Sequence, residues 1–108
     1  MAEEALVVLA TFPDAETARR IVRTLVEEKL AACGNIVPGL ESIYRWEGKI
    51  ESSAEVLVIF KTTLGKYLEF EQGLRALHPY EVPEILGLPV QEGSLPYLRW
   101  LQDAVNPD

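Results

Sequence analysis

The chain has few residues of the types that form disulfides and many metal or catalytic sites: its 108 residues include one cysteine, one histidine and one methionine. With Cys33 as its only cysteine, the chain forms no intramolecular disulfide, although a bridge between subunits stays open. With His78 as its only histidine, it contains no HExxH motif, and there is no CxxC pair either. Because no glycine cluster joins a strand pattern to a helix pattern, a phosphate-cradling loop is also absent.

The chain also has few positively charged residues: 10 Lys and Arg residues stand against 17 Asp and Glu residues, which gives a net charge of −7. Nucleic-acid-binding domains usually present a clustered basic face. Here Arg19, Arg20 and Arg23 are interspersed with Glu16 and Glu27, as is typical of a solvated helix face. We therefore expect no nucleic-acid partner, and no apolar run reaches the length of a membrane span.

The first residues, Met1-Ala2-Glu3-Glu4, are acidic where a secretory signal would be basic. The apolar run that follows has only the length of a strand. A single cysteine fits a reducing compartment. We therefore expect a cytoplasmic protein that does not associate with membranes.

Periodicity predicts an alternating series of strands and helices. The predicted strands are residues 5–12, 33–46, 54–62 and 84–90, and the predicted helices are residues 18–30, 64–77 and a short segment after Ser94. Asp14 and Ser94 are the expected N-caps, and Pro79 should end the second helix at His78. The order βαββαβ plus a terminal helix predicts an α+β, ferredoxin-like sandwich with both main helices on one face of an antiparallel sheet. We expect one domain over residues 1–108.

The predicted strands are apolar on both faces. In the third strand Val56, Val58 and Phe60 alternate with Leu57 and Ile59, and the first strand shows the same pattern. Two helices cover one face only, so the other apolar face needs a further cover. We expect a homo-oligomer packed through its sheets; alternatively, the short terminal helix folds over part of the open face.

The densest group of chemically active side chains is the segment His78-Pro79-Tyr80-Glu81-Val82-Pro83-Glu84. Its two prolines predict a stiff, non-helical strip. At the end of a helix, His78 would serve as an imidazolium that donates to the last carbonyls. Alternatively, His78 is a metal ligand completed by Glu81, Glu84 or Cys33 through folding or a neighbouring subunit.

Four other residues allow two interpretations each. Cys33 is a small buried apolar residue or, paired with the distant imidazole, part of a site. Tyr44 and Trp46 share one strand face with Ser42 and either pack in a subunit contact or line a cleft in which Lys61 supplies charge.

With one histidine in the chain, any general acid–base catalysis would depend on carboxylates and a lysine, so we expect that the protein is not an enzyme.

Several strings together resemble the CutA divalent-cation tolerance family. They are Ala31-Ala32-Cys33, Asn35-Ile36-Val37-Pro38, Ser42-Ile43-Tyr44-Arg45-Trp46, Lys61-Thr62-Thr63 and His78-Pro79-Tyr80-Glu81-Val82-Pro83-Glu84-Ile85. The resemblance implies a ferredoxin-like fold, a compact homotrimer and an architecture related to the PII signalling proteins. One departure is Gly34, where the family more often has an apolar side chain; it would loosen the strand or mark a bulge.

The resemblance also implies a cleft between subunits. Its residues would be Cys33, Tyr44, Trp46, Lys61, His78, Tyr80, Glu81, Glu84 and Trp100. The first hypothesis is a trimeric protein that binds divalent metal, copper foremost, through His78, Glu81, Glu84 and Cys33, with the remaining residues forming a ligand cleft. The alternative is a PII-like small-ligand sensor or protein-interaction adaptor without metal chemistry. Neither implies an organic cofactor, and neither identifies a protein partner.

Overall fold

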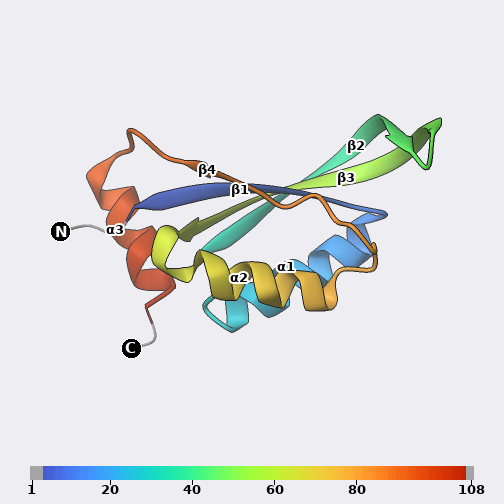
Figure 1. Cartoon of the computed structure of the whole chain (residues 1–108). Coiled ribbons are helices and arrows are strands. Elements are labelled where there is room, and N and C mark those ends of the chain that lie inside the picture. The colour runs from blue at the N-terminus through green and yellow to red at the C-terminus, as the bar shows by residue number, and fades with distance from the viewer. Residues whose placement is uncertain (1–3, 107–108) are drawn as a thin grey trace.

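Four strands form one antiparallel sheet in the order β2-β3-β1-β4, and α1 and α2 lie together against one of its faces (Figure 1). The computed structural model describes residues 4–106. Its elements are β1 Ala5–Phe12, α1 Ala15–Glu27, β2 Cys33–Trp46, β3 Lys49–Thr63, α2 Leu64–Leu77, β4 Leu86–Pro89 and α3 Leu95–Ala104. The predicted α+β, ferredoxin-like order is confirmed. Within the described part of the chain, no helix combines the length and apolarity that a membrane span needs.

The expected helix ends are confirmed by their capping contacts. Asp14 accepts a 2.7 Å hydrogen bond from the Thr17 amide, and Ser94 accepts one of 3.3 Å from the Tyr97 amide. α2 ends at His78, whose extended backbone is the conformation that a following proline favours. By contrast, α1 ends at Glu27, three residues before the predicted end, and Lys29 then has a φ of 61°.

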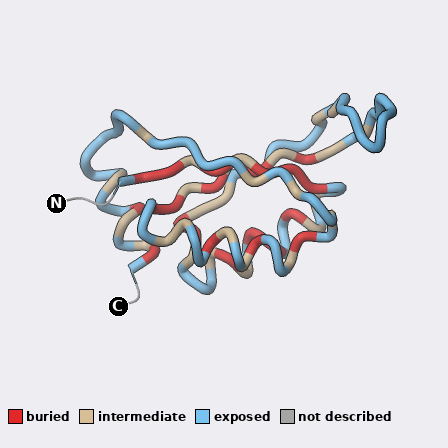
Figure 2. The backbone as a smooth tube through the Cα atoms, viewed as in Figure 1, coloured by how far each residue is buried: buried red, intermediate tan, exposed pale blue. Residues whose placement is uncertain are grey.

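Two strands differ in length from their predicted ranges because of their pairing partners. β3 begins at Lys49 rather than at residue 54, since residues 49–53 pair with residues 42–46 of β2 up to the turn. β4 is shorter than predicted and pairs with only four residues of β1, from Leu6 to Leu9. The result is a long β2–β3 hairpin that extends beyond the helices, and Figure 2 shows that its tip is exposed.

The main core lies between the sheet and the two helices. Alternate residues of β1 and β3 meet apolar residues of α1 and α2, and the largest fully buried side chains include Val8, Phe12, Val58, Phe60, Ile21, Leu25, Phe70 and Leu74. Phe60 packs edge-on against Phe12 and Phe70, with ring centroids 6.4 and 5.0 Å apart. This close-packed layer fixes which face of each strand points away from the helices.

The opposite face of the sheet is also apolar, as the two-sided strands predict. Leu9 and Ile59 are partly exposed there, and Leu86 and Leu88 of β4 are 57% and 48% exposed. We call this surface the open face. α3 covers only one end of the sheet, where Leu101 and Val105 pack on Ala5 and Ala32. The terminal helix therefore does not cover the open face, so among the described elements most of this apolar surface has no partner.

A bulge in β2 changes which residues of that strand belong to the open face. Val37 pairs with Leu57 but Leu40 pairs with Glu55, so one extra residue lies on β2 at Pro38–Gly39. Gly39 has a φ of +82°, which glycine adopts without strain. The extra residue reverses the alternation, and Tyr44 and Trp46 therefore lie on the same face as Leu57.

The bulge expected as one outcome at Gly34 does not occur there. Gly34 pairs in register with Phe60 on the helix-covered face. A Cβ atom at this position would lie 2.8 Å from Val22 Cγ1 and 3.2 Å from Phe60 Cδ1. Glycine at position 34 therefore allows α1 to approach β2 closely.

Candidate functional site

His78 is buried and uses both ring nitrogens within the chain. Only 7% of the residue is exposed, and Nε2 lies 2.8 Å from the carbonyl oxygen of Thr11. Nδ1 accepts a 3.1 Å hydrogen bond from the Tyr80 amide. Since Nδ1 is the acceptor, Nε2 carries the proton and donates to Thr11. The ring also stacks on Phe12, with centroids 4.6 Å apart and planes at 20°.

The structure corrects the capping role expected of this imidazole. Burial lowers the pKa of His78 below its ordinary value of 6.5, so the ring is neutral rather than an imidazolium at pH 7. The helix end is instead capped by the backbone amide of His78, which donates to the Leu74 carbonyl. The ring ties the Pro79–Glu84 strip to β1, and a metal ion could bind it only after one of its two hydrogen bonds breaks.

A cleft lies between the hairpin and the strip that follows His78. It has a volume of about 860 Å³. Tyr44 and Trp46 of β2 line it on one side, and Tyr80, Glu81 and Glu84 line it on the other. Thr11, Ser42, Ile43, Ser53, Glu55, Pro79, Val82 and Pro83 complete the lining. The fold thus brings together five of the nine site residues that the sequence resemblance implies.

Glu55 is a cleft residue that sequence reasoning missed. Its Oε2 accepts a 2.6 Å hydrogen bond from the Tyr80 hydroxyl, which joins the strip to β3. Burial, followed by the contact with Glu55, raises the pKa of Tyr80 far above its ordinary value, so the phenol keeps its proton. The available signal was weak: Glu55 directly precedes the apolar run that begins at Val56, and other polar residues precede it on β3.

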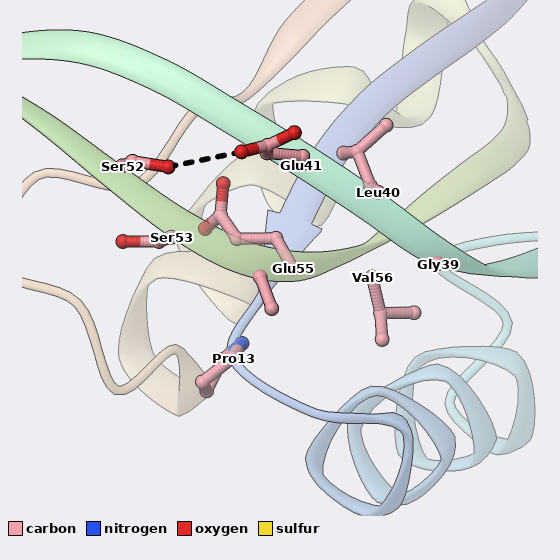
Figure 3. A pocket seen from close by; sticks show the side chains of 9 residues that line it. Pro13, Gly39, Leu40, Glu41, Ser52, Ser53, Glu55 and Val56 are labelled. Carbon is pink, nitrogen blue, oxygen red and sulfur yellow. Dashed lines mark hydrogen bonds between the residues drawn. The ribbon is translucent and has the colours of Figure 1, made fainter.

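A second, smaller hollow lies beside the cleft and shares Ser53 and Glu55 in its lining. It has a volume of about 510 Å³ and includes Pro13, Glu41 and Ser52. Ser52 donates a 3.3 Å hydrogen bond to Glu41 across the two strands, and Figure 3 shows this bond with Glu55 nearby on β3. Glu41 pairs with Ala54 and Glu55 pairs with Leu40, so the two carboxylates lie on opposite faces of the strands at the base of the hairpin.

Cys33, Lys61 and Trp100 lie at the other end of the sheet. Cys33 and Lys61 are cross-strand partners, and Lys61 donates a hydrogen bond to Asn35 Oδ1. The Cys33 sulfur lies 3.9 Å from the Tyr97 hydroxyl, and the rings of Tyr97 and Trp100 are 5.4 Å apart. Burial raises the pKa of Tyr97, and the Cys33 contact adds to this effect.

The implied site residues therefore form two separate groups on one chain. Lys61 is ten residues along β3 from Glu51, the partner of Tyr44, which corresponds to about 30 Å of strand. Within residues 4–106, no three side chains of His, Cys, Asp or Glu lie close enough together to hold a metal ion. One chain alone does not unite Cys33 with Glu81 and Glu84.

Comparison with known proteins identifies relatives over nearly the whole chain. A family model described as "CutA1 divalent ion tolerance protein" matches residues 6–104. The "Divalent-cation tolerance protein CutA" of Thermus thermophilus is 53% identical over 97 residues, which cover 90% of this chain and 94% of that protein.

Solved structures agree with the sequence matches. The Thermus thermophilus divalent cation tolerance protein superposes with a TM-score of 0.90 at 51% identity, covering 93% of this chain and 97% of that one. CutA1 from Oryza sativa gives a TM-score of 0.94 at 41% identity, covering 99% and 98%.

The expectation of a cytoplasmic protein is wrong. The rice and Arabidopsis thaliana relatives, each 44% identical, are named chloroplastic, and this chain spans 57% and 56% of their lengths. The Archaeoglobus fulgidus structure, with a TM-score of 0.91 at 38% identity over 94% of this chain and 99% of that one, is called periplasmic. The same domain thus belongs to proteins of different compartments, and neither Cys33 nor the acidic first residues identify one.

The matched family is described by tolerance to divalent ions rather than by a reaction. The match covers the hairpin, the strip after His78 and all of α3, so both groups of implied site residues fall inside it. The chain therefore belongs to the CutA1 divalent ion tolerance family.

Proposed function

We propose that the chain, acting as one domain over residues 1–108, forms a homotrimer that binds divalent cations, Cu(II) foremost, in clefts between subunits. The observation that supports this proposal best is the cleft whose lining includes Glu55, Glu81 and Glu84, next to an uncovered apolar sheet face. Membership in a divalent ion tolerance family supplies the class of ligand.

The open face supports assembly of several copies. Leu9, Ile59, Leu86 and Leu88 form an apolar surface of the kind that subunit contacts bury. The family resemblance and the PII-like architecture favour three copies. In such a ring, the Cys33–Lys61–Trp100 end of one copy would lie against the Tyr44–Trp46–Tyr80 cleft of the next, and a complete site would draw on two chains.

The geometry favours Glu81 and Glu84 as the first ligands. Both are exposed and lie three residues apart on the stiff strip. His78 lies beneath the strip and holds it to β1, so it would contribute to metal binding mainly by positioning. Cys33 of a neighbouring copy is a further candidate ligand. Among first-row divalent ions, Cu(II) is expected to bind most tightly to such donors.

Calorimetric titration of metal-stripped protein with Cu(II) and Zn(II), under a competing chelator, tests the proposal. We expect saturable binding at one site per chain and at least a tenfold loss of affinity in Glu81→Gln/Glu84→Gln. The matched control is Glu27→Gln/Glu28→Gln, which removes two exposed carboxylates at the end of α1 and should bind as the wild type does.

Two further variants identify the other ligands. Retained binding in His78→Ala would assign a positioning role to the imidazole, whereas lost binding with a preserved fold would make it a ligand. Loss of affinity in Cys33→Ser would place the thiol in the site. Substoichiometric binding that the chelator removes, unchanged in Glu81→Gln/Glu84→Gln, would overturn the metal proposal.

A second candidate function is a PII-like small-ligand sensor or adaptor without metal chemistry. The aromatic side chains of Tyr44, Trp46 and Tyr80 in the cleft favour it, because a bare metal ion makes no use of them. A thermal-shift screen of the trimer tests it, since a ligand at a hundred times its dissociation constant stabilises the folded state by about 2.7 kcal/mol. The absence of any reproducible shift across metabolites would contradict this candidate.

A further inference from the structure

Lys61 carries a charge on the open face that its own chain does not balance. It lies on β3 between its cross-strand partners Cys33 and Val7, next to the partly exposed Ile59. Its Nζ donates a hydrogen bond to Asn35 Oδ1, and among residues 4–106 no Asp or Glu side chain forms an ion pair with it. A neutral amide accepts one of its protons but leaves the positive charge uncompensated.

The cleft between the hairpin and the strip after His78 has the opposite imbalance. Glu55, Glu81 and Glu84 line it, and no lysine or arginine of the same chain is among the described lining residues. The Tyr80 hydroxyl donates to Glu55, whereas Glu81 and Glu84 are exposed. Carboxylates in one cleft repel each other and attract a cation, so the cleft is stabilised by a positive charge from outside its own chain.

These two imbalances complement each other in the proposed homotrimer, where the Lys61 end of one copy lies against the cleft of the next. We propose that Lys61 of each copy pairs with Glu81 and Glu84 of its neighbour, so that a divalent metal must displace this ammonium group to bind. Burial of an unpaired ammonium between copies costs free energy, and an ion pair offsets that cost. This inference rests on the proposed trimer and on its metal site, whose affinity it makes dependent on Lys61.

Competition between the ammonium and the metal fixes the sign of the expected effect. Lys61→Gln removes one positive charge beside a site for a doubly charged ion, so it should bind Zn(II) about tenfold more tightly than the wild type does. Lys61→Arg keeps the charge and should bind within about twofold of the wild type. The matched control is Lys66→Gln, because Lys66 pairs with Glu69 on α2, outside the open face, and its loss should leave the affinity unchanged.

Calorimetric titration of the metal-stripped, full-length protein with Zn(II), under a competing chelator, measures these affinities. Sedimentation must show the same assembly for the wild type and each variant. Equal or weaker Zn(II) binding in Lys61→Gln would overturn the competition and leave the metal proposal intact. Absence of Zn(II) binding in every variant and in the wild type would overturn the metal proposal and the competition together.

The ion pair itself is tested without metal by a double-mutant cycle on subunit association. Lys61→Gln and Glu81→Gln/Glu84→Gln should each raise the subunit dissociation constant, measured by sedimentation over a dilution series in urea. Because both changes remove the same ion pair, the combined variant should dissociate about as readily as either one alone. Effects that multiply would mean that the residues act independently and would overturn the pairing. This second measurement also covers the case in which Lys61→Gln no longer assembles as the wild type does.

Discussion

His78 Nε2 donates a 2.8 Å hydrogen bond to the carbonyl oxygen of Thr11, 67 positions earlier in the chain. The bond joins the strip that carries Glu81 and Glu84 to the end of a central strand. On its other side, the same ring accepts a hydrogen bond from the Tyr80 amide. The position of two candidate metal-binding carboxylates therefore depends on one neutral imidazole.

This arrangement predicts a pH-dependent stability. Burial lowers the pKa of His78 in the folded state below its ordinary value of 6.5, so below pH 6.5 the unfolded state binds more protons than the folded state. The contribution of neutral His78 to the free energy of unfolding is therefore fully present above pH 6.5. It decreases as pH falls towards the folded-state pKa of His78. Urea unfolding at intervals from pH 5 to pH 8 measures the free energy of unfolding.

His78→Gln is the control for this measurement, because His78 is the only histidine in the chain. The variant should have a lower free energy of unfolding than the wild type. This free energy should no longer change with pH between pH 5 and pH 7. Asp14 also has a lowered pKa, mainly because it accepts a hydrogen bond from the Thr17 amide. Its contribution to the free energy of unfolding decreases only below about pH 3.8, outside the range in which His78 titrates. A slope that persists in His78→Gln would contradict the assignment.

The hydrogen bond between Tyr80 and Glu55 predicts a second effect on stability. Tyr80→Phe removes the donor at 2.6 Å and should lower the free energy of unfolding by about 1–2 kcal/mol, since a hydrogen bond to a carboxylate exceeds a neutral one. Combining it with Glu55→Gln in a double-mutant cycle should show coupling of similar size. Additive losses would mean that the two side chains act independently.

Gly34 predicts the effect of a close contact between β2 and α1. Gly34→Ala places a methyl group 2.8 Å from Val22 Cγ1, and the β-branched valine in a helix has little rotameric freedom to move away. We expect a loss of about 1–3 kcal/mol in the free energy of unfolding. Val22→Ala should lower the free energy of unfolding when made alone. Combined with Gly34→Ala, it should recover much of the free energy that Gly34→Ala loses. If the double variant shows no recovery, the strain does not come from the contact with Val22.

The open face predicts the effect of a charge on assembly. Leu57→Lys places an ammonium group on the apolar face that we propose to be buried between copies, so sedimentation at micromolar concentration should show monomers. Leu68→Lys is the matched control, because Leu68 is 67% exposed on α2 and lies outside that face. A wild type that sediments as a monomer would contradict the trimer itself.

Local patterns predicted most of the fold because they depend on neighbouring residues. Asp14 and Ser94 accept the capping bonds expected of their side chains, and Pro79 ends α2 at His78. Strand ends were predicted less well, because they depend on a partner strand. Residues 49–53 show no strong apolar alternation, but pairing with residues 42–46 makes them part of β3.

The candidate site was harder to predict because it depends on long-range contacts. The resemblance named nine residues, and the fold places Tyr44, Trp46, Tyr80, Glu81 and Glu84 in one cleft. Cys33, Lys61 and Trp100 lie far from it along the sheet. The role of Glu55 was not predicted from the sequence because it comes from a hydrogen bond to Tyr80, 25 positions away.

The sequence by itself determined the order of strands and helices, the two N-caps, the end of α2 and the two apolar faces of the sheet, since these follow from periodicity and the backbone preferences of single residues. Only the tertiary structure decided that His78 donates to Thr11 and that the bulge at Pro38–Gly39 places Tyr44 on the open face. The physical reason is that a contact between distant residues depends on strand register, and one extra residue reverses every side chain beyond it.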